Sequence, residues 1–169
     1  MDTVEVFNAL PTDRLEGDLL ACCAVPAWGA TIIAKRPFRE RLEIISTADA
    51  AARALTWDEV RLGLSAHPRI GERASGESKE ASWSRREQST AAQGSDELTR
   101  AALVDVNRAY EKRFGHVFLI FASGRTQEEI LAVARDRLVN DEETERVIVA
   151  DELRKIALLR LERVLDALG

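Results

Sequence analysis

The chain has 169 residues, of which 46% are hydrophobic and 31% charged, and its formal net charge is −5 at pH 7. This composition is typical of a folded globular protein and excludes a disordered chain, and the length suits a single domain over residues 1–169. The negative charge argues against nucleic acid as the main partner. The chain shows no signal peptide and no apolar run of membrane length, so we expect a cytoplasmic protein without membrane contact.

Helical periodicity extends through almost the entire sequence. In chain order, the predicted helices lie before residue 10 and over residues 15–23, 26–36, 39–55, 57–67, 84 onward, 95–114, 126 onward and 140–168. Capping boxes at Thr56-x-x-Glu59 and Thr126-x-x-Glu129 predict the starts of two of them. Only residues 117–121 lack a helical pattern, and they form either a short strand or a buried extended segment. The sequence therefore predicts an all-α, single-domain helical bundle.

Two further features bear on compartment and function. Cys22 and Cys23 are adjacent in an apolar run, so they cannot form an unstrained disulfide, and no second pair completes a zinc site. We interpret them as reduced core residues, which agrees with a cytosol-like compartment. Residues 70–82 are rich in Gly, Ser, Glu and Lys and predict a loop of about a dozen residues, a length typical of functional segments.

The main candidate for a functional site is the stretch His67-Pro68-Arg69-Ile70-Gly71-Glu72 together with Ser84-Arg85-Arg86-Glu87-Gln88. A histidine and a carboxylate brought together form an acid–base pair that works near neutral pH. Each has a structural alternative. The imidazole of His67 can stabilise the end of the preceding helix through the helix dipole, and Ser84-x-x-Glu87 matches a capping box.

Four other polar residues allow both structural and functional interpretations. Arg85 and Arg86 are most simply solvated, and His116 fits a partly buried histidine whose ring is satisfied by the backbone. Arg160 lies near the apolar side of the last helix, where a long arginine is unusual without an anionic partner. On these residues alone, an acid–base site is one hypothesis among several.

An ordered series of motifs extends over nearly the whole chain and resembles the 2-oxo-4-hydroxy-4-carboxy-5-ureidoimidazoline (OHCU) decarboxylases. The motifs are His67-Pro68-Arg69-Ile70-Gly71, Ser84-x-x-Glu87-Gln88, Asn107-x-x-Tyr110-Glu111-x-x-Phe114-Gly115, Arg137-Leu138-x-Asn140, Glu145 and Lys155-Ile156-x-x-Leu159-Arg160-Leu161. The family catalyses the third step of urate degradation to allantoin. The resemblance implies an all-helical fold, often a homodimer, with no metal or organic cofactor.

The resemblance also implies roles for individual residues. His67 would be the catalytic acid/base, and Glu87 would be its carboxylate partner. The residues expected to bind the ureidoimidazoline substrate are Pro68, Ser84, Arg85, Arg86, Gln88, Leu119, Ile120, Phe121, Ala122, Ser123 and Arg160. Within this set, residues 119–123 would supply main-chain hydrogen bonds, and Arg160 would hold a substrate carbonyl or carboxylate.

The sequence departs from the family pattern at residues 89–94, where a Gly-containing turn is typical, and at His116, where an aromatic residue is frequent. Other classes of protein stay open beside the decarboxylase. One is a helical ureide-binding protein without turnover, and another is a structural interaction module. A metal-dependent hydrolase using His67 and His116 is disfavoured, because the sequence has only two histidines and no helical ligand pair.

Overall fold

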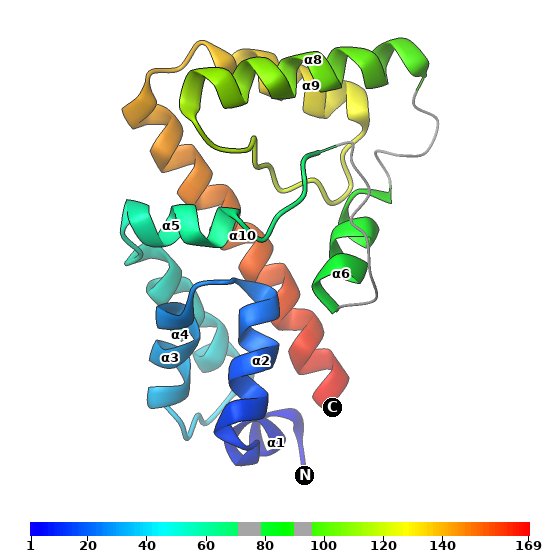
Figure 1. Cartoon of the computed structure of the whole chain (residues 1–169). Coiled ribbons are helices and arrows are strands. Elements are labelled where there is room, and N and C mark those ends of the chain that lie inside the picture. The colour runs from blue at the N-terminus through cyan, green and yellow to red at the C-terminus, as the bar shows by residue number, and fades with distance from the viewer. Residues whose placement is uncertain (71–78, 90–95) are drawn as a thin grey trace. The chain divides into compact units, whose positions relative to one another are not determined.

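The computed structural model describes residues 1–70, 79–89 and 96–169, and the regular structure of this part of the chain is helical throughout (Figure 1). The prediction of an all-α fold is confirmed. The helices are α1 (Thr3–Ala9), α2 (Thr12–Cys22), α3 (Pro26–Ala34), α4 (Arg41–Arg53), α5 (Trp57–Leu64), α6 (Lys79–Glu87), α8 (Glu97–Phe114), α9 (Gln127–Leu138) and α10 (Glu142–Leu168). They form two compact units, residues 1–63 with 153–169 (the terminal unit) and residues 64–152 (the central unit).

In the terminal unit, α3 packs against both α2 and α4. The indole Nε1 of Trp28 donates a buried hydrogen bond to the carbonyl of Ala48 at 3.0 Å, which joins α3 to α4. Asp49 of α4 accepts hydrogen bonds from Arg53 and from Arg154 of α10, and these arginines hold the pKa of its carboxyl below the ordinary value. The thiols of Cys22 and Cys23 are reduced and buried, as expected of core residues.

In the central unit, α8 packs along α9. Its core combines side chains of these helices with alternate residues of a non-helical segment. That core contains Ile70, Leu103, Val106, Tyr110, Phe118, Ile120, Ala122, Ile130, Leu131 and Ala134. Because the side chains of residues 118, 120 and 122 all enter the core, the segment has the period of an extended chain.

Two glycines with positive φ bound this extended segment. Gly115 has φ +80° and ends α8 in the left-handed conformation, and Gly124 has φ +79° just before α9. Glycine adopts this conformation without a Cβ penalty, so the chain turns sharply at both points. Residues 117–121, for which the sequence allows a short strand or a buried extended segment, lie between these glycines. They form a buried extended segment without strand pairing to any described residue.

The described helices start within two residues of the predicted positions except at α2 and α6, and α2 begins at Thr12 rather than at residue 15. The capping boxes at Thr56 and Thr126 are present, with Glu59 N–H donating to Thr56 Oγ1 and Glu129 N–H to Thr126 Oγ1, each at 3.2 Å. The prediction that a helix begins at Ser84 is wrong, because α6 begins at Lys79. The expected loop over residues 70–82 is therefore shorter, and residues 71–78 of it lie outside the described part.

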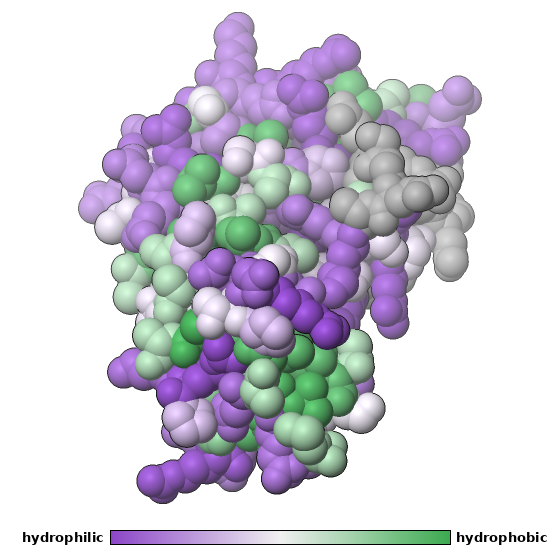
Figure 2. Space-filling model, turned by 60° about the horizontal axis from the view of Figure 1, so that its bottom comes forward, coloured by the Kyte–Doolittle hydropathy of each residue, from purple (hydrophilic) through white to green (hydrophobic). Residues whose placement is uncertain are grey.

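Hydrophilic side chains cover much of the face drawn in Figure 2, and hydrophobic side chains gather in one area of it. The large hydrophobic residues that are exposed include Leu42, Leu62, Leu98, Val139 and Val147. Within the residues that the structure describes, none of the helices has the length and apolar character needed to cross a membrane.

Candidate active site

The best-defined part of the candidate site is one face of α6. Ser84 and Glu87 lie three residues apart and therefore on the same side of the helix, where they are 5% and 6% exposed. The structure thus excludes the capping-box interpretation of this pair, because Ser84 lies inside the helix. A buried carboxylate is costly to desolvate, so a position such as Glu87 is typical of a structural or chemical role that needs the charge.

The neighbouring predicted residues differ in exposure. Gln88 follows α6 directly, and its N–H donates to the carbonyl of Ser84 at 3.2 Å. Its side chain and that of Arg85 are half-buried, whereas Arg86 is exposed, in agreement with a solvated side chain. Substrate roles for all three stay predictions.

His67 lies just beyond the C-terminus of α5, and its backbone N–H donates to the carbonyl of Leu64 at 3.0 Å. Pro68 follows it and prevents the helix from continuing. Both side chains are half-buried, so the imidazole is neither a core residue nor fully solvated. The pairing of His67 with Glu87 stays a prediction.

Helix α8 anchors the chain immediately after this histidine. The side-chain Nδ2 of Asn107 donates to the carbonyl of Ile70 at 2.7 Å, in a buried position. One turn further along α8, Glu111 accepts from Arg69 at 2.6 Å and 3.2 Å in a two-pronged ion pair. These contacts fix the backbone on the C-terminal side of His67 and Pro68.

The segment of residues 119–123 was expected to offer main-chain hydrogen bonds. Within it the N–H of Phe121 donates to Glu152 Oε1 at 3.4 Å, and the carbonyl of Ala122 accepts from the N–H of Arg125 at 3.0 Å. The N–H groups of Ile120 and Ala122 have no acceptor among the described residues. A buried peptide group without a partner costs roughly 1–3 kcal/mol, so these two N–H groups are the ones in the segment that a ligand would satisfy.

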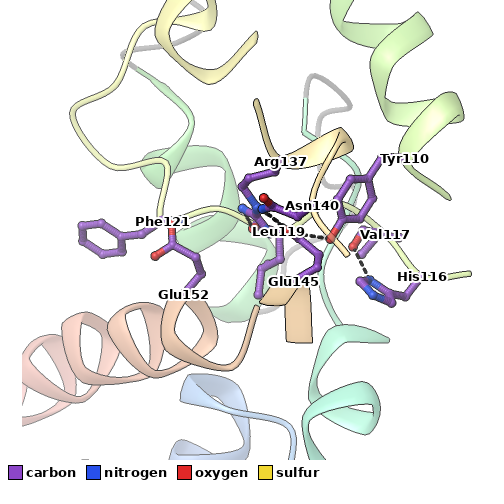
Figure 3. A network of polar contacts seen from close by, with 9 residues as sticks. All are labelled: Tyr110, His116, Val117, Leu119, Phe121, Arg137, Asn140, Glu145 and Glu152. Atoms are coloured by element: carbon purple, nitrogen blue, oxygen red, sulfur yellow. Dashed lines mark hydrogen bonds and ion pairs between the residues drawn. The ribbon is translucent and has the colours of Figure 1, made fainter. Parts of the chain in front are cut away.

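A buried polar network fixes the same segment from one side (Figure 3). Arg137 and Glu145, only 4% and 0% exposed, form an ion pair at the turn between α9 and α10. The Nε of Arg137 also donates to Glu145 Oε1 at 2.8 Å, and its Nη1 donates to the carbonyl of Leu119 at 2.7 Å. One guanidinium therefore joins the buried carboxylate to the backbone of the extended segment.

Two other side chains complete the network around Glu145. The hydroxyl of Tyr110 donates to Oε1 at 2.5 Å, and Nδ2 of Asn140 donates to Oε2 at 3.1 Å. Burial, together with the hydrogen bond to Glu145 and its negative charge, raises the pKa of the Tyr110 hydroxyl far above the ordinary value of 10.0. The tyrosine is therefore a neutral donor throughout the physiological range.

His116 and Arg160 complete the set of candidate residues. The ring Nδ1 of His116 lies 3.0 Å from the carbonyl of Val117, and the ring packs against Tyr110 and Phe114. This half-buried histidine is satisfied by the backbone, as expected. Arg160 is 1% exposed, and its Nη1 donates to the carbonyl of Ala21 at 3.1 Å within the terminal unit. Its proposed contact with substrate stays a prediction.

The sequence interpretation gave no role to Arg137, Glu145, Tyr110 or Glu152. The first three stand in the motifs that carry the family resemblance, which was the available signal, and all four side chains are buried in the structure. Within the described residues, no three His, Cys, Asp or Glu side chains are grouped so that they can hold a metal ion.

The structure defines a helical protein with a buried glutamate on α6 and a buried extended segment in which the N–H groups of Ile120 and Ala122 have no acceptor among the described residues. Residues 8–162 match the OHCU decarboxylase family model, so the chain belongs to the OHCU decarboxylase family. A crystal structure of an OHCU decarboxylase in the presence of (S)-allantoin has a similar fold, with a TM-score of 0.75 and 29% identity. The match covers 87% of this chain and 96% of that one.

Two curated relatives add to this result. The uric acid degradation bifunctional protein TTL of Arabidopsis thaliana is 30% identical over 152 residues, which make up 88% of this chain and 47% of that protein. The 2-oxo-4-hydroxy-4-carboxy-5-ureidoimidazoline decarboxylase of Amia calva is 38% identical over 61 residues, 36% of this chain and 35% of that protein. The matched regions thus span half or less of these relatives.

Proposed function

We propose that this protein decarboxylates 2-oxo-4-hydroxy-4-carboxy-5-ureidoimidazoline to (S)-allantoin, with His67 as acid/base and Glu87 as its carboxylate partner. Membership of the OHCU decarboxylase family carries the proposal. The burial of Glu87 on the face of α6 that also bears Ser84 supports the assignment of roles.

The substrate itself provides the electron sink. Its carboxylate is bonded to a carbon that also bears a hydroxyl and lies next to a ring C=N unit. When the bond to CO₂ breaks, its electron pair forms a C=C bond, and the C=N π electrons move to the nitrogen, which takes a proton. The enol-like intermediate then loses the hydroxyl proton and gains a proton on the neighbouring carbon, which gives allantoin.

In this scheme His67 exchanges the proton of the hydroxyl or delivers the proton to carbon, on one face only. Glu87 accepts a hydrogen bond from the imidazole, which fixes its tautomer and raises its basicity. The negative charge of Glu87 also disfavours the nearby substrate carboxylate, and this repulsion is relieved as neutral CO₂ departs. No organic cofactor or metal is required for these steps.

The remaining predicted residues bind the substrate. The main chain of residues 119–123 provides hydrogen bonds for a ureide, through groups such as the N–H of Ile120 and of Ala122, and Arg160 provides a positive charge for its carbonyl or carboxylate. Pro68, Ser84, Arg85, Arg86 and Gln88 form the other contacts. We further propose that the protein acts as a single-domain homodimer in the cytoplasm.

A second candidate function is a ureide-binding protein without turnover. The N–H groups of Ile120 and Ala122, which have no acceptor among the described residues, favour it equally, because such groups can bind a ureide without any chemistry. Turnover separates the two proposals, since a binding protein leaves the spontaneous decay of the ureidoimidazoline unchanged.

The test is the formation of optically active allantoin. The purified protein is mixed, at neutral pH and with a chelator, with the ureidoimidazoline generated from urate by the two preceding enzymes, and circular dichroism is recorded. A rapid signal of the (S) enantiomer supports a stereospecific, metal-independent decarboxylase. A signal no faster than the racemic background rejects it and leaves the binding protein.

A further inference from the structure

We infer that Arg137 and Glu152 are positioning residues that aim the peptide groups of Ile120 at the substrate, and that Glu145 and Tyr110 hold Arg137 in place. This inference rests on the proposed function, because it assigns the ureide-binding part of that same site. None of these four side chains is required to touch the substrate.

Two contacts set the direction of the peptide groups on either side of Ile120. The peptides on both sides of Ile120 are trans, since the cis peptide among the described residues precedes Pro37. In a trans peptide, C=O and N–H point in opposite directions. Arg137 binds the carbonyl of Leu119, so the N–H of Ile120 points away from the guanidinium. Glu152 binds the N–H of Phe121, so the carbonyl of Ile120 points away from that carboxylate.

Ile120 itself is buried, and its peptide groups have no partner among the described residues. The residue is 1% exposed, its side chain belongs to the core of the central unit, and its N–H and carbonyl have no hydrogen-bond partner within residues 1–70, 79–89 and 96–169. A donor and an acceptor on one residue complement the C=O and N–H of an amide or ureide. Because the side chain is fixed in the core, the backbone contacts on either side decide where these two groups point.

Several contacts hold the guanidinium of Arg137 in place. Glu145 accepts two hydrogen bonds from Arg137 and one from Tyr110, and the guanidinium lies 4.6 Å from the ring centroid of Phe118. Figure 3 shows Arg137, Tyr110 and Asn140 converging on Glu145, with Leu119 beside the guanidinium. Because Glu145 and the ring of Phe118 hold the planar guanidinium, its Nη1 is fixed against the Leu119 carbonyl.

The test uses the double variant Arg137→Met/Glu145→Gln. It removes both buried charges together, which avoids an unpaired buried ion, and it retains an acceptor for Tyr110 at position 145. The matched control is Arg113→Met, because Arg113 also donates to a backbone carbonyl of the central unit, that of Asn140, at the same distance of 2.7 Å. In the double variant we expect kcat/KM to fall roughly 10- to 100-fold, mainly through a higher KM, whereas the control retains both constants.

Amide NMR provides a readout that needs no substrate. The resonances of Ile120 and Phe121 shift in the double variant and stay in place in Arg113→Met. If the double variant fails to fold, Arg137→Lys replaces it, since a lysine keeps the buried positive charge but loses the planar fork, and the same shifts in NMR and KM are expected.

Two outcomes overturn the inference. One is a folded double variant, or a folded Arg137→Lys, whose Ile120 and Phe121 resonances are those of the wild type. The other is a variant whose melting temperature falls while kcat and KM stay unchanged. An inactive wild-type protein rejects the proposed function instead, and the NMR comparison then still decides whether Arg137 orients the segment.

Discussion

The hydroxyl of Tyr110 donates to Oε1 of Glu145 at 2.5 Å, and both side chains are fully buried in the central unit. The same oxygen accepts from Arg137, so a single carboxylate joins α8, the end of α9 and the start of α10. Its burial makes the contact important for stability, because a carboxylate that loses partners in the interior is not compensated by water.

Replacement of this tyrosine is expected to destabilise the protein without preventing folding. Tyr110→Phe removes one hydrogen bond to a charged group and leaves the Arg137 contacts of Glu145, so the free energy of unfolding falls by about 1.5–3 kcal/mol. Denaturant unfolding of the two proteins measures this difference. An unchanged free energy of unfolding would contradict the importance of the hydrogen bond.

The same hydroxyl predicts a dependence of stability on high pH. Its pKa is raised in the folded state, so folded protein retains the proton that unfolded protein releases above pH 10.0, the ordinary value. The stabilisation is therefore complete below that pH and declines as the pH rises above it. Tyr110 is the single tyrosine of the chain, so the near-ultraviolet tyrosinate band reports on it alone.

We expect this band to appear only together with loss of the helical circular dichroism signal. Tyr110→Phe provides the blank, since it has no tyrosine. A titration at the ordinary pKa in protein that stays folded would show that the hydroxyl is not buried against Glu145.

Two glycines give a matched test of packing in the terminal unit. A Cβ added to Gly63 lies 3.0 Å from Cδ2 of Leu153 and 3.2 Å from Cγ2 of Val25, whereas a Cβ on Gly17 meets no described atom within 4 Å. Gly63→Ala is expected to lower the free energy of unfolding by about 1 kcal/mol, because both neighbours are buried.

Gly17→Ala is expected to act in the opposite direction. This residue lies inside α2, where alanine stabilises a helix by roughly 0.5–1 kcal/mol relative to glycine. Thermal or denaturant unfolding of the two variants gives the comparison. An equal change in the free energy of unfolding for both variants would contradict the close approach of α5 to Val25 and Leu153.

Replacement of Arg160 tests substrate binding separately from catalysis. Arg160→Lys keeps a positive charge but not the planar fork, so we expect KM to rise roughly tenfold with a smaller change in kcat. Arg36→Lys is the control, because Arg36 also donates to backbone carbonyls of the terminal unit, those of Phe7, Asn8 and Leu10. A KM that is equal in both variants and the wild type would remove Arg160 from substrate binding.

The sequence predicted those features that depend on neighbouring residues. The capping boxes at Thr56 and Thr126 are local hydrogen-bond patterns, and both are present. The same rule failed at Ser84, because a serine and a glutamate three residues apart also occur together on the inner face of a helix. The two cases differ in where the helix begins, and α6 includes the residues from Lys79 onward, so Ser84 cannot be its N-cap.

The anchoring of residues 119–123 was not predictable from local patterns. Arg137 is 18 residues from its partner Leu119, and Glu152 is 31 residues from its partner Phe121, so both contacts depend on how α9 and α10 pack against the extended segment. Hydrophobic periodicity identified the segment as non-helical, but its hydrogen-bond partners come from charged residues on other elements. The network therefore became visible only in three dimensions.

The most direct test of the account compares wild type and His67→Asn in the circular dichroism assay for (S)-allantoin. Asparagine retains a hydrogen-bonding side chain but cannot exchange a proton near neutral pH, so we predict a rate that is roughly 10²- to 10⁴-fold lower with an unchanged helical spectrum. A His67→Asn protein that forms (S)-allantoin at the wild-type rate would contradict the assignment of this histidine as the acid/base of the reaction.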